Sequence, residues 1–173
     1  IRNSQKKKYN FWDADFPDTG LLRENYLDKI NDFIGNKLIK VLVGQRRAGK
    51  SYLLRQIIHS LIGKGVNPKN IFYINKEFTD FDFISNYTEL EDLILTYRQE
   101  LKPEGKIFLF IDEVQRITGW EHLINSYSQS YTRTYEIFIS GSNSQLLSAE
   151  LATLLSGRYI QFCRQILSLS RPI

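Results

Sequence analysis

The chain has 173 residues, of which 42% are hydrophobic and 13% aromatic, with a formal net charge of +4. This length accommodates one domain with a sizeable core and excludes a large second domain. The sequence shows neither an apolar stretch long enough to span a membrane nor a secretory signal pattern. The single cysteine, Cys163, cannot form an internal disulfide, and His59 and His122 form no metal-binding pattern. We therefore expect a cytoplasmic protein with no membrane partner.

A basic run opens the sequence. Arg2, Lys6, Lys7 and Lys8 lie in a segment with little core-forming character, so we predict a flexible N-terminal arm over residues 1–20. Such an arm is either simply solvated or contacts nucleic acid, whose phosphates attract lysine and arginine. Because the sequence contains no methionine, we also expect it to be a piece of a longer protein.

The next segment predicts a helix, a strand and a loop. The pattern LLRENYLDKINDFI predicts a helix over Leu21–Ile34, and the apolar run Leu38–Val43 predicts a buried strand. Directly after that strand, residues 44–51 read GQRRAGKS, an instance of G-x-x-x-x-G-K-[ST], the Walker A pattern. The following residues, YLLRQIIHSLIGKG, have the apolar spacing of a buried helix.

A glycine-rich loop between a strand and a helix binds phosphate groups. Its backbone N–H groups point into one concavity, and the positive end of the helix dipole lies there. The sequence therefore predicts a nucleoside triphosphate site formed by Gly44, Gln45, Arg46, Arg47, Ala48, Gly49, Lys50, Ser51 and Tyr52.

Two residues of this loop have specific predicted roles. Lys50 is expected to reach the β- and γ-phosphates, and the Ser51 hydroxyl is expected to ligate Mg²⁺. The side chains of Arg46 and Arg47 face either solvent or a partner. The alternative is a glycine turn with a solvated lysine, but a chance match gives no reason for a strand before the loop and a helix after it.

A second motif follows further along the chain. Ile71–Asn75 predicts a strand, ELEDLILTYRQEL predicts a helix, and the apolar run Ile107–Ile111 predicts a central strand that ends in Asp112-Glu113, the Walker B pattern. Parallel strands bring their carboxyl ends to one edge of a sheet. We therefore expect Asp112 to meet the glycine-rich loop and to hold Mg²⁺ together with Ser51.

Glu113 is the candidate catalytic base. A carboxylate in this position can orient and deprotonate a water molecule that attacks the γ-phosphate. The alternative is a solvated residue at a strand end. Glu77, which follows the second predicted strand, is a rival base, and we favour Glu113 because it adjoins the aspartate on the Mg²⁺ side.

The remaining pattern completes the expected fold. Glu121–Tyr131 predicts a helix, Tyr135–Ser140 a strand, SQLLSAELATLLSG a helix, and Arg158–Cys163 a last strand. Strands that alternate with helices at this spacing predict an α/β fold with a central, mostly parallel sheet and helices on both faces. A GTPase would carry a base-reading NKxD motif late in the chain, and none is present there.

Three segments together resemble a known family: GQRRAGKSYLL, IFLFIDEVQRITGWE and ISGSNSQLLSAELATLLSGRY. They resemble the ATPase domain of prokaryotic AAA-like P-loop ATPases of the ASCE arrangement, which are related to the archaeal ATPases. The resemblance covers about Leu21 to Ser170. In that family a C-terminal domain, often nuclease-like, follows the ATPase domain. The resemblance therefore implies an ATPase domain over residues 21–173, with the C-terminal domain absent, that binds ATP and Mg²⁺ in the cytoplasm and hydrolyses the nucleotide.

The resemblance also implies roles for two residues late in the chain. Asn143, next to Ser142, occupies the place where AAA-type ATPases carry a sensor of the γ-phosphate or the lytic water, although a hydroxyl there could instead cap the next helix. Arg158 could compensate charge on the γ-phosphate, either within its own subunit or as a finger that reaches a neighbour in a homo-oligomer. The alternative is an arginine that pairs with a surface acid.

Two functional classes follow from these predictions. One is an enzyme that hydrolyses ATP to drive a mechanical or nucleic-acid-directed task. The other is a regulatory switch that binds ATP tightly, turns over slowly and acts through an effector in the missing C-terminal part. Both use the same nucleotide site, and they differ in the rate of hydrolysis.

Overall fold

The computed structural model describes residues 10–12, 19–142, 155 and 157–164, and a five-stranded sheet forms its centre. The spatial order of the strands is β2-β3-β4-β1-β5, and every neighbouring pair is parallel. The predicted α/β fold with a parallel sheet is confirmed. The strands are β1 (Ile39–Gly44), β2 (Ile71–Asn75), β3 (Ile107–Asp112), β4 (Tyr135–Gly141) and β5 (Tyr159–Arg164).

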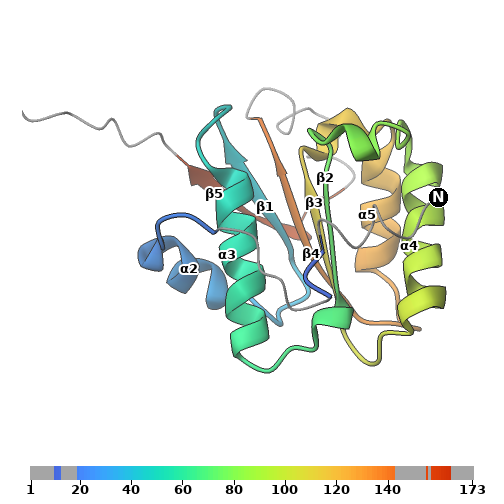
Figure 1. Ribbon diagram of the computed structural model, residues 1–173, viewed down its shortest axis with the longest axis horizontal. Coiled ribbons are helices and arrows are strands. Elements are labelled where there is room, and N and C mark those ends of the chain that lie inside the picture. Colours follow the sequence, from blue (N-terminus) through green and yellow to red (C-terminus); the bar gives the residue numbers. More distant parts are fainter. Residues whose placement is uncertain (1–9, 13–18, 143–154, 156, 165–173) are drawn as a thin grey trace, which may run out of the picture.

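Helices cover both faces of the sheet. Figure 1 shows α2 and α3 on one side and α4 and α5 on the other. Three short 3₁₀ turns, η1, η2 and η3, lie in the connections. The bounds are α2 (Glu24–Asn31), α3 (Lys50–Gly63), α4 (Tyr87–Leu101), α5 (Trp120–Ser128), η1 (Pro68–Asn70), η2 (Thr79–Phe81) and η3 (Val114–Arg116).

The strands are apolar on both faces because each face is covered. Along β3, Ile107, Leu109 and Ile111 belong to the hydrophobic core on the α4–α5 side. Phe108 and Phe110 alternate with them and belong to the core on the α2–α3 side, as the two-residue period of a strand requires. This double burial explains why the strand reads as an uninterrupted apolar run.

The helices differ in extent from their predictions; α5, for example, spans Trp120–Ser128 in place of the predicted Glu121–Tyr131. The helix predicted over Leu21–Ile34 is shorter, since α2 spans only Glu24–Asn31, and the Gln56 side-chain amide instead donates hydrogen bonds to the carbonyls of Thr19 and Leu21, at 2.7 Å each. Helix α4 starts earlier than the pattern suggested. The Asn86 side chain accepts hydrogen bonds from the first turn and forms a capping box with Glu89, which fixes the start at Tyr87.

The prediction of a flexible arm over residues 1–20 is wrong for residues 10–12. The Asn10 side chain accepts a hydrogen bond from the Tyr73 N–H at 2.7 Å and donates one to the Tyr73 carbonyl at 3.1 Å. Phe11 is fully buried, and the Trp12 indole donates a hydrogen bond to the Ile71 carbonyl at 2.6 Å. These contacts hold the segment along the outer strand β2. Residues 1–9 and 13–18 lie outside the described residues.

A buried ion pair lies on the α2–α3 side of the sheet. The Lys40 ammonium of β1 contacts the Glu136 carboxylate of β4, and both side chains are buried. Glu136 also accepts hydrogen bonds from the Gly35 N–H, at 3.1 Å to each oxygen, and from Lys106 at 3.1 Å. Burial outweighs the ion pair and lowers the pKa of Lys40. The cluster joins the turn after α2 to the start of the sheet.

No described helix is both long and apolar enough to cross a membrane.

We expect Glu136→Leu to lower the free energy of unfolding by about 3–5 kcal/mol, because it leaves the buried Lys40 ammonium without a charged partner, with only the Asn36 side chain as acceptor. The double variant Lys40→Met/Glu136→Leu should recover most of this loss. The folded pKa of Lys40 lies below its unfolded value, so the unfolded chain binds more protons between these two pKa values. The free energy of unfolding of Glu136→Leu should therefore rise as the pH rises through this range.

Urea unfolding at two pH values measures both effects. Glu104→Leu, a change of an exposed glutamate, is the matched control and should shift the free energy by less than about 0.5 kcal/mol. If Glu136→Leu lowers the free energy of unfolding no more than Glu104→Leu does, the stabilising role of the buried Lys40–Glu136 ion pair is contradicted.

Candidate nucleotide-binding site

The glycine-rich loop connects β1 to α3 at the carboxyl edge of the sheet. Strand β1 ends at Gly44 and α3 begins at Lys50. The helix N-cap is Gly49, whose φ of 77° is left-handed, a conformation that glycine adopts at no steric cost. Arg47 also has a positive φ, of 64°. The loop thus turns sharply and presents the positive end of α3 to the space above the sheet.

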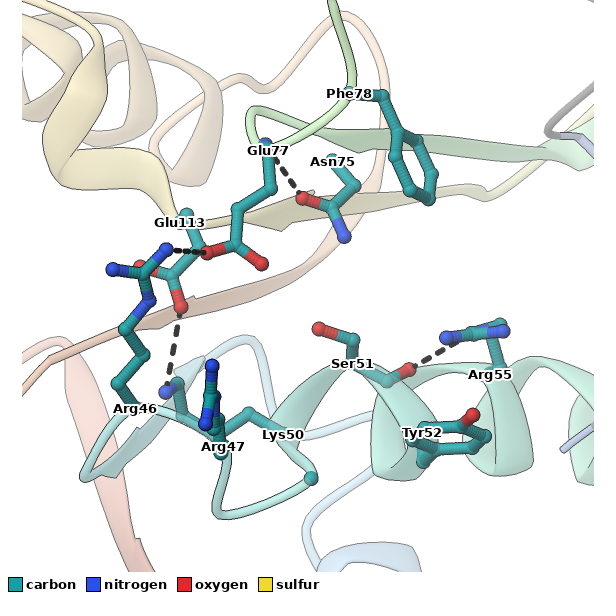
Figure 2. Close-up of a pocket in the computed structure, with 11 residues that line it drawn as sticks. Arg46, Arg47, Lys50, Ser51, Tyr52, Arg55, Asn75, Glu77, Phe78 and Glu113 are labelled. Carbon is teal, nitrogen blue, oxygen red and sulfur yellow. Dashed lines mark hydrogen bonds and ion pairs between the residues drawn. The ribbon is translucent and has the colours of Figure 1, made fainter. Parts of the chain in front are cut away.

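The Lys50 side chain lies over its own loop. Its ammonium donates hydrogen bonds to the carbonyls of Gly44 at 3.0 Å and Gln45 at 3.2 Å. The same nitrogen lies 3.4 Å from Glu113 Oε1, and both side chains are largely buried (Figure 2). The lysine therefore joins the phosphate loop to the end of β3.

Asp112 is the most buried acid of the site. Its carboxylate accepts hydrogen bonds from the Ser140 hydroxyl, from the Ser51 hydroxyl and, at 3.4 Å, from the Tyr73 hydroxyl. Burial raises the pKa of Asp112, and the hydrogen bonds from Ser140 and Ser51 oppose this rise. The structure thus brings Asp112 and Ser51 together at one edge of the sheet.

Ser140 is a residue of the site that the sequence analysis missed. It lies in β4, fully buried, where its hydroxyl donates to Asp112 and accepts a hydrogen bond from the Glu113 N–H at 3.1 Å. One hydroxyl therefore fixes both acidic residues of the Walker B motif. The available signal was a serine inside the apolar strand YEIFISG, at the end that meets the site.

Glu113 is held by donors on both carboxylate oxygens. Oε1 faces Lys50, and Oε2 accepts a hydrogen bond from the Gln115 side-chain amide at 2.5 Å. The backbone of Glu113 is left-handed, with φ 57° and ψ 48°, so the chain turns sharply after β3. Such strain often accompanies functional positions. Gln115 belongs to a segment that carries the family resemblance, but the sequence analysis gave it no role.

Glu77, the rival base, has a different environment. Its Oε1 lies 3.6 Å from Arg46 Nη2 and 3.9 Å from Arg116 Nη2. Its N–H donates a hydrogen bond to Asn75 Oδ1 at 2.8 Å, and Asn75 is the strand partner of Asp112. Two guanidinium groups therefore compensate the charge of Glu77, whereas Glu113 faces the phosphate loop.

A pocket of about 330 Å³ opens above the loop. Figure 2 shows Lys50, Arg46 and Arg47 rising from the loop on one side, and Glu77 and Glu113 facing them from the other. Beyond Ser51, the Tyr52 ring lies 4.5 Å from the Arg55 guanidinium carbon. The lining residues are Arg46, Arg47, Gly49, Lys50, Ser51, Tyr52, Arg55, Asn75, Glu77, Phe78 and Glu113.

The residues present fit Mg²⁺ bound with a nucleotide. In the part of the chain that the structure describes, no group of three or more histidine, cysteine, aspartate or glutamate residues is arranged to hold a metal ion by itself. Mg²⁺ commonly binds through one or two protein oxygens, phosphate oxygens and water. The adjacent oxygens of Ser51 and Asp112 supply such a pair beside the phosphate loop.

One predicted site residue, Arg158, does not gather with the others. Arg158 precedes β5, where its carbonyl accepts a hydrogen bond from the Ile39 N–H at the start of β1, and its side chain donates to Asn125 at 2.6 Å. The phosphate loop lies at the other end of β1, on the order of 17 Å away at ~3.3 Å per residue. The structure therefore does not bring Arg158 to the pocket of its own chain. Asn143 lies outside the described residues.

The fold and the loop define the class of the protein. A parallel sheet with a glycine-rich loop after its first strand and an acidic pair at the end of a nearby strand is a P-loop NTPase domain. Residues 36–170 match the model of a family described as an AAA domain. The chain therefore belongs to this AAA domain family, a class of nucleotide-binding ATPases.

Two curated proteins are similar to this chain in sequence. An uncharacterized protein of Haemophilus influenzae is 41% identical over 141 residues, which are 80% of this chain and 34% of the relative. An uncharacterized protein of Methanocaldococcus jannaschii is 39% identical over 136 residues, which are 74% of this chain and 26% of the relative. The chain thus spans about a third or less of the length of these relatives.

Solved structures of AAA-type proteins share the fold at low sequence identity. The Aeropyrum pernix ORC1 protein, solved in complex with DNA, has a TM-score of 0.59 at 14% identity, over 91% of this chain and 49% of that one. The Thermotoga maritima RuvB Holliday junction branch migration motor has a TM-score of 0.52 at 19% identity, over 82% and 44%.

We expect Asp112→Asn to stabilise the nucleotide-free chain and to weaken nucleotide binding in the presence of Mg²⁺. Because the folded pKa of Asp112 lies above the ordinary value, the ionised carboxylate opposes folding at neutral pH, and this penalty is relieved as the pH falls through the folded pKa. The neutral amide removes the penalty, so the melting temperature should rise by roughly 2 °C or more.

Thermal unfolding with and without Mg·ATP measures both effects. Asp92→Asn, at an exposed position of α4, is the matched control and should change neither quantity. An Asp112→Asn variant that retains the full Mg²⁺-dependent gain in melting temperature would rule out the role of Asp112 as a metal ligand.

Proposed function

We propose that this chain binds Mg·ATP in the pocket above the phosphate loop and hydrolyses it to ADP and phosphate. One observation supports the proposal: Lys50, the lysine expected to bind phosphate, lies 3.4 Å from Glu113, the candidate base, beside Ser51 and Asp112. A phosphate group that binds Lys50 is thereby adjacent to a carboxylate and to two Mg²⁺-type ligands.

Each of these residues has a distinct part in the proposed reaction. The N–H groups at the start of α3 and the Lys50 ammonium bind the phosphates. Ser51 and Asp112 would hold Mg²⁺, which when bound supplies charge compensation to the β- and γ-phosphates. Glu113 accepts a proton from the attacking water as the water oxygen bonds to the γ-phosphorus. The bond from that phosphorus to the bridging oxygen breaks, and ADP leaves with the electron pair.

The contacts of Glu113 link its role as a base to phosphate binding. Lys50 and Gln115 both donate to the Glu113 carboxylate, so its oxygens are engaged. A phosphate group that draws Lys50 away frees Oε1 to receive a proton. This requirement also favours the second candidate function, a switch that retains ATP and turns over slowly, because the base becomes available only after a rearrangement.

Two residues late in the chain have further proposed roles. Asn143 would sense the γ-phosphate, and Arg158 would act on the nucleotide of a neighbouring chain, since it lies far from its own loop. The names of two structural neighbours mention DNA and a Holliday junction motor. For this chain, cytoplasmic action on nucleic acid through ATP turnover is a proposal, and stimulation of turnover by added DNA or RNA tests it.

We expect Lys50→Ala to weaken Mg·ATP binding by about 100-fold, or roughly 3 kcal/mol, since it removes the charge-assisted bonds to the phosphates. Titration calorimetry with a non-hydrolysable ATP analogue measures the affinity. Lys64→Ala, a change of an exposed lysine at the opposite end of α3, should bind like the parent. Equal affinities in all three proteins would exclude the proposed site.

We expect Glu113→Gln to keep nucleotide affinity and to lower the hydrolysis rate by roughly 10²–10⁴-fold, because the amide cannot accept the proton. Phosphate release under saturating Mg·ATP measures the rate, and Glu104→Gln is the control at an exposed position. Parent-like turnover by Glu113→Gln would place the base elsewhere, with Glu77 the next residue to test. Tight binding by a parent that barely turns over would support the switch.

A further inference from the structure

We propose that Arg46, within the phosphate loop, supplies in its own chain the positive charge that stabilises the γ-phosphate during transfer, and that Glu77 positions it. This inference rests on the proposed ATP hydrolysis and assigns to it a further residue. An arginine that acts on the nucleotide of its own chain is thereby distinguished from an arginine that reaches the nucleotide from a neighbouring chain.

The position of Arg46 carries the inference. The pocket above the loop has a neighbouring hollow of about 250 Å³, and Arg46, Glu77 and Glu113 line both spaces. Arg46 therefore lies on the boundary between them, and Figure 2 shows its guanidinium paired with Glu77, on the same side of the loop as Lys50. A γ-phosphate bound between Lys50 and Glu113 would lie within the range of this guanidinium.

The ion pair with Glu77 orients the Arg46 side chain. Arg46 Nη2 lies 3.6 Å from Glu77 Oε1, and Arg116 Nη2 approaches the same oxygen at 3.9 Å. With 79% of its side chain exposed, Arg46 is bound only weakly by this contact. An exposed pair of this kind holds the guanidinium at the pocket yet releases it readily to a more highly charged phosphate group, to which a guanidinium binds bidentately.

Arg116 shares Glu77 with Arg46, but it follows the end of β3 rather than the loop, and it also donates to the Lys76 carbonyl at 3.4 Å. The remaining arginines are placed for different contacts. Arg55 lies over the Tyr52 ring and donates to the Ser51 carbonyl at 3.3 Å. Arg158 lies at the opposite edge of the sheet, bonded to Asn125. Arg47 lines the pocket above the loop, whereas Arg46 also borders the hollow shared by Glu77 and Glu113. Arg46 is thus the loop arginine placed between the two acids.

The test compares Arg46→Ala, Arg46→Lys and Glu77→Gln with the parent. Arg46→Ala should bind Mg·ATP within about threefold of the parent and turn it over about 10³-fold more slowly, since the charge acts mainly in the transition state. Arg46→Lys should recover part of the rate, because an ammonium carries the charge without the planar fork. Glu77→Gln should lower the rate by about tenfold with binding intact.

A second measurement does not depend on turnover. The parent should retain ADP together with aluminium fluoride, a mimic of the transferred phosphoryl group, and Arg46→Ala should lose this retention while it still binds ADP. Arg133→Ala, a change at the opposite edge of the sheet, where Arg133 donates to the Pro103 carbonyl, should match the parent in both measurements. The high exposure of Arg46 means that its variants should unfold at the parent temperature.

A mixture of variants distinguishes the two sources of charge. If Arg46 acts within its own chain, a mixture of Arg46→Ala and Lys50→Ala stays inactive, because no site in it has both residues. Restored turnover in the mixture, or parent-like turnover and aluminium fluoride retention by Arg46→Ala alone, would overturn the inference. A parent that binds Mg·ATP without turnover would contradict the proposed hydrolysis instead, and retention would still decide the role of Arg46.

Discussion

A carboxylate without exposed surface organises this protein. Asp112 ends the central strand β3, and hydroxyl groups of Ser140, Ser51 and Tyr73 come to it from β4, α3 and β2. A buried charge is costly unless it is hydrogen-bonded or paired, so these elements must meet at one point for the charge to be tolerated. The geometry of the phosphate loop follows, since Ser51 and Lys50 are adjacent residues at the start of α3.

Much of this arrangement could be predicted from the sequence. The apolar run IFLFI has the length and composition of a strand buried on both faces, and parallel strands align their carboxyl ends, which places Asp112 near the loop after β1. Ser140 and Gln115 could not be assigned in the same way. Their importance depends on which side chain faces Asp112 or Glu113, and a pattern of apolar residues carries no information on such polar contacts.

The errors of the sequence interpretation have a similar cause. Residues 10–12 have little periodicity and follow a run of lysines, so nothing local predicts that Asn10 and Trp12 bind the backbone of β2. The start of α2 was predicted too early because Leu21 and Leu22 fit a helical pattern, whereas the contacts of Gln56 hold this segment in another conformation. In both cases partners distant in the sequence decide the local structure.

The segment 10–12 has a consequence for handling the protein. Strand β2 is the outermost strand on its side of the sheet, and Asn10 and Trp12 occupy backbone groups that would otherwise face solvent. An uncovered outer strand is a template on which other chains can add strands and aggregate. Expression vectors that begin at the helix α2 would remove this cover, so a soluble preparation depends on retaining the residues from Asn10 onward.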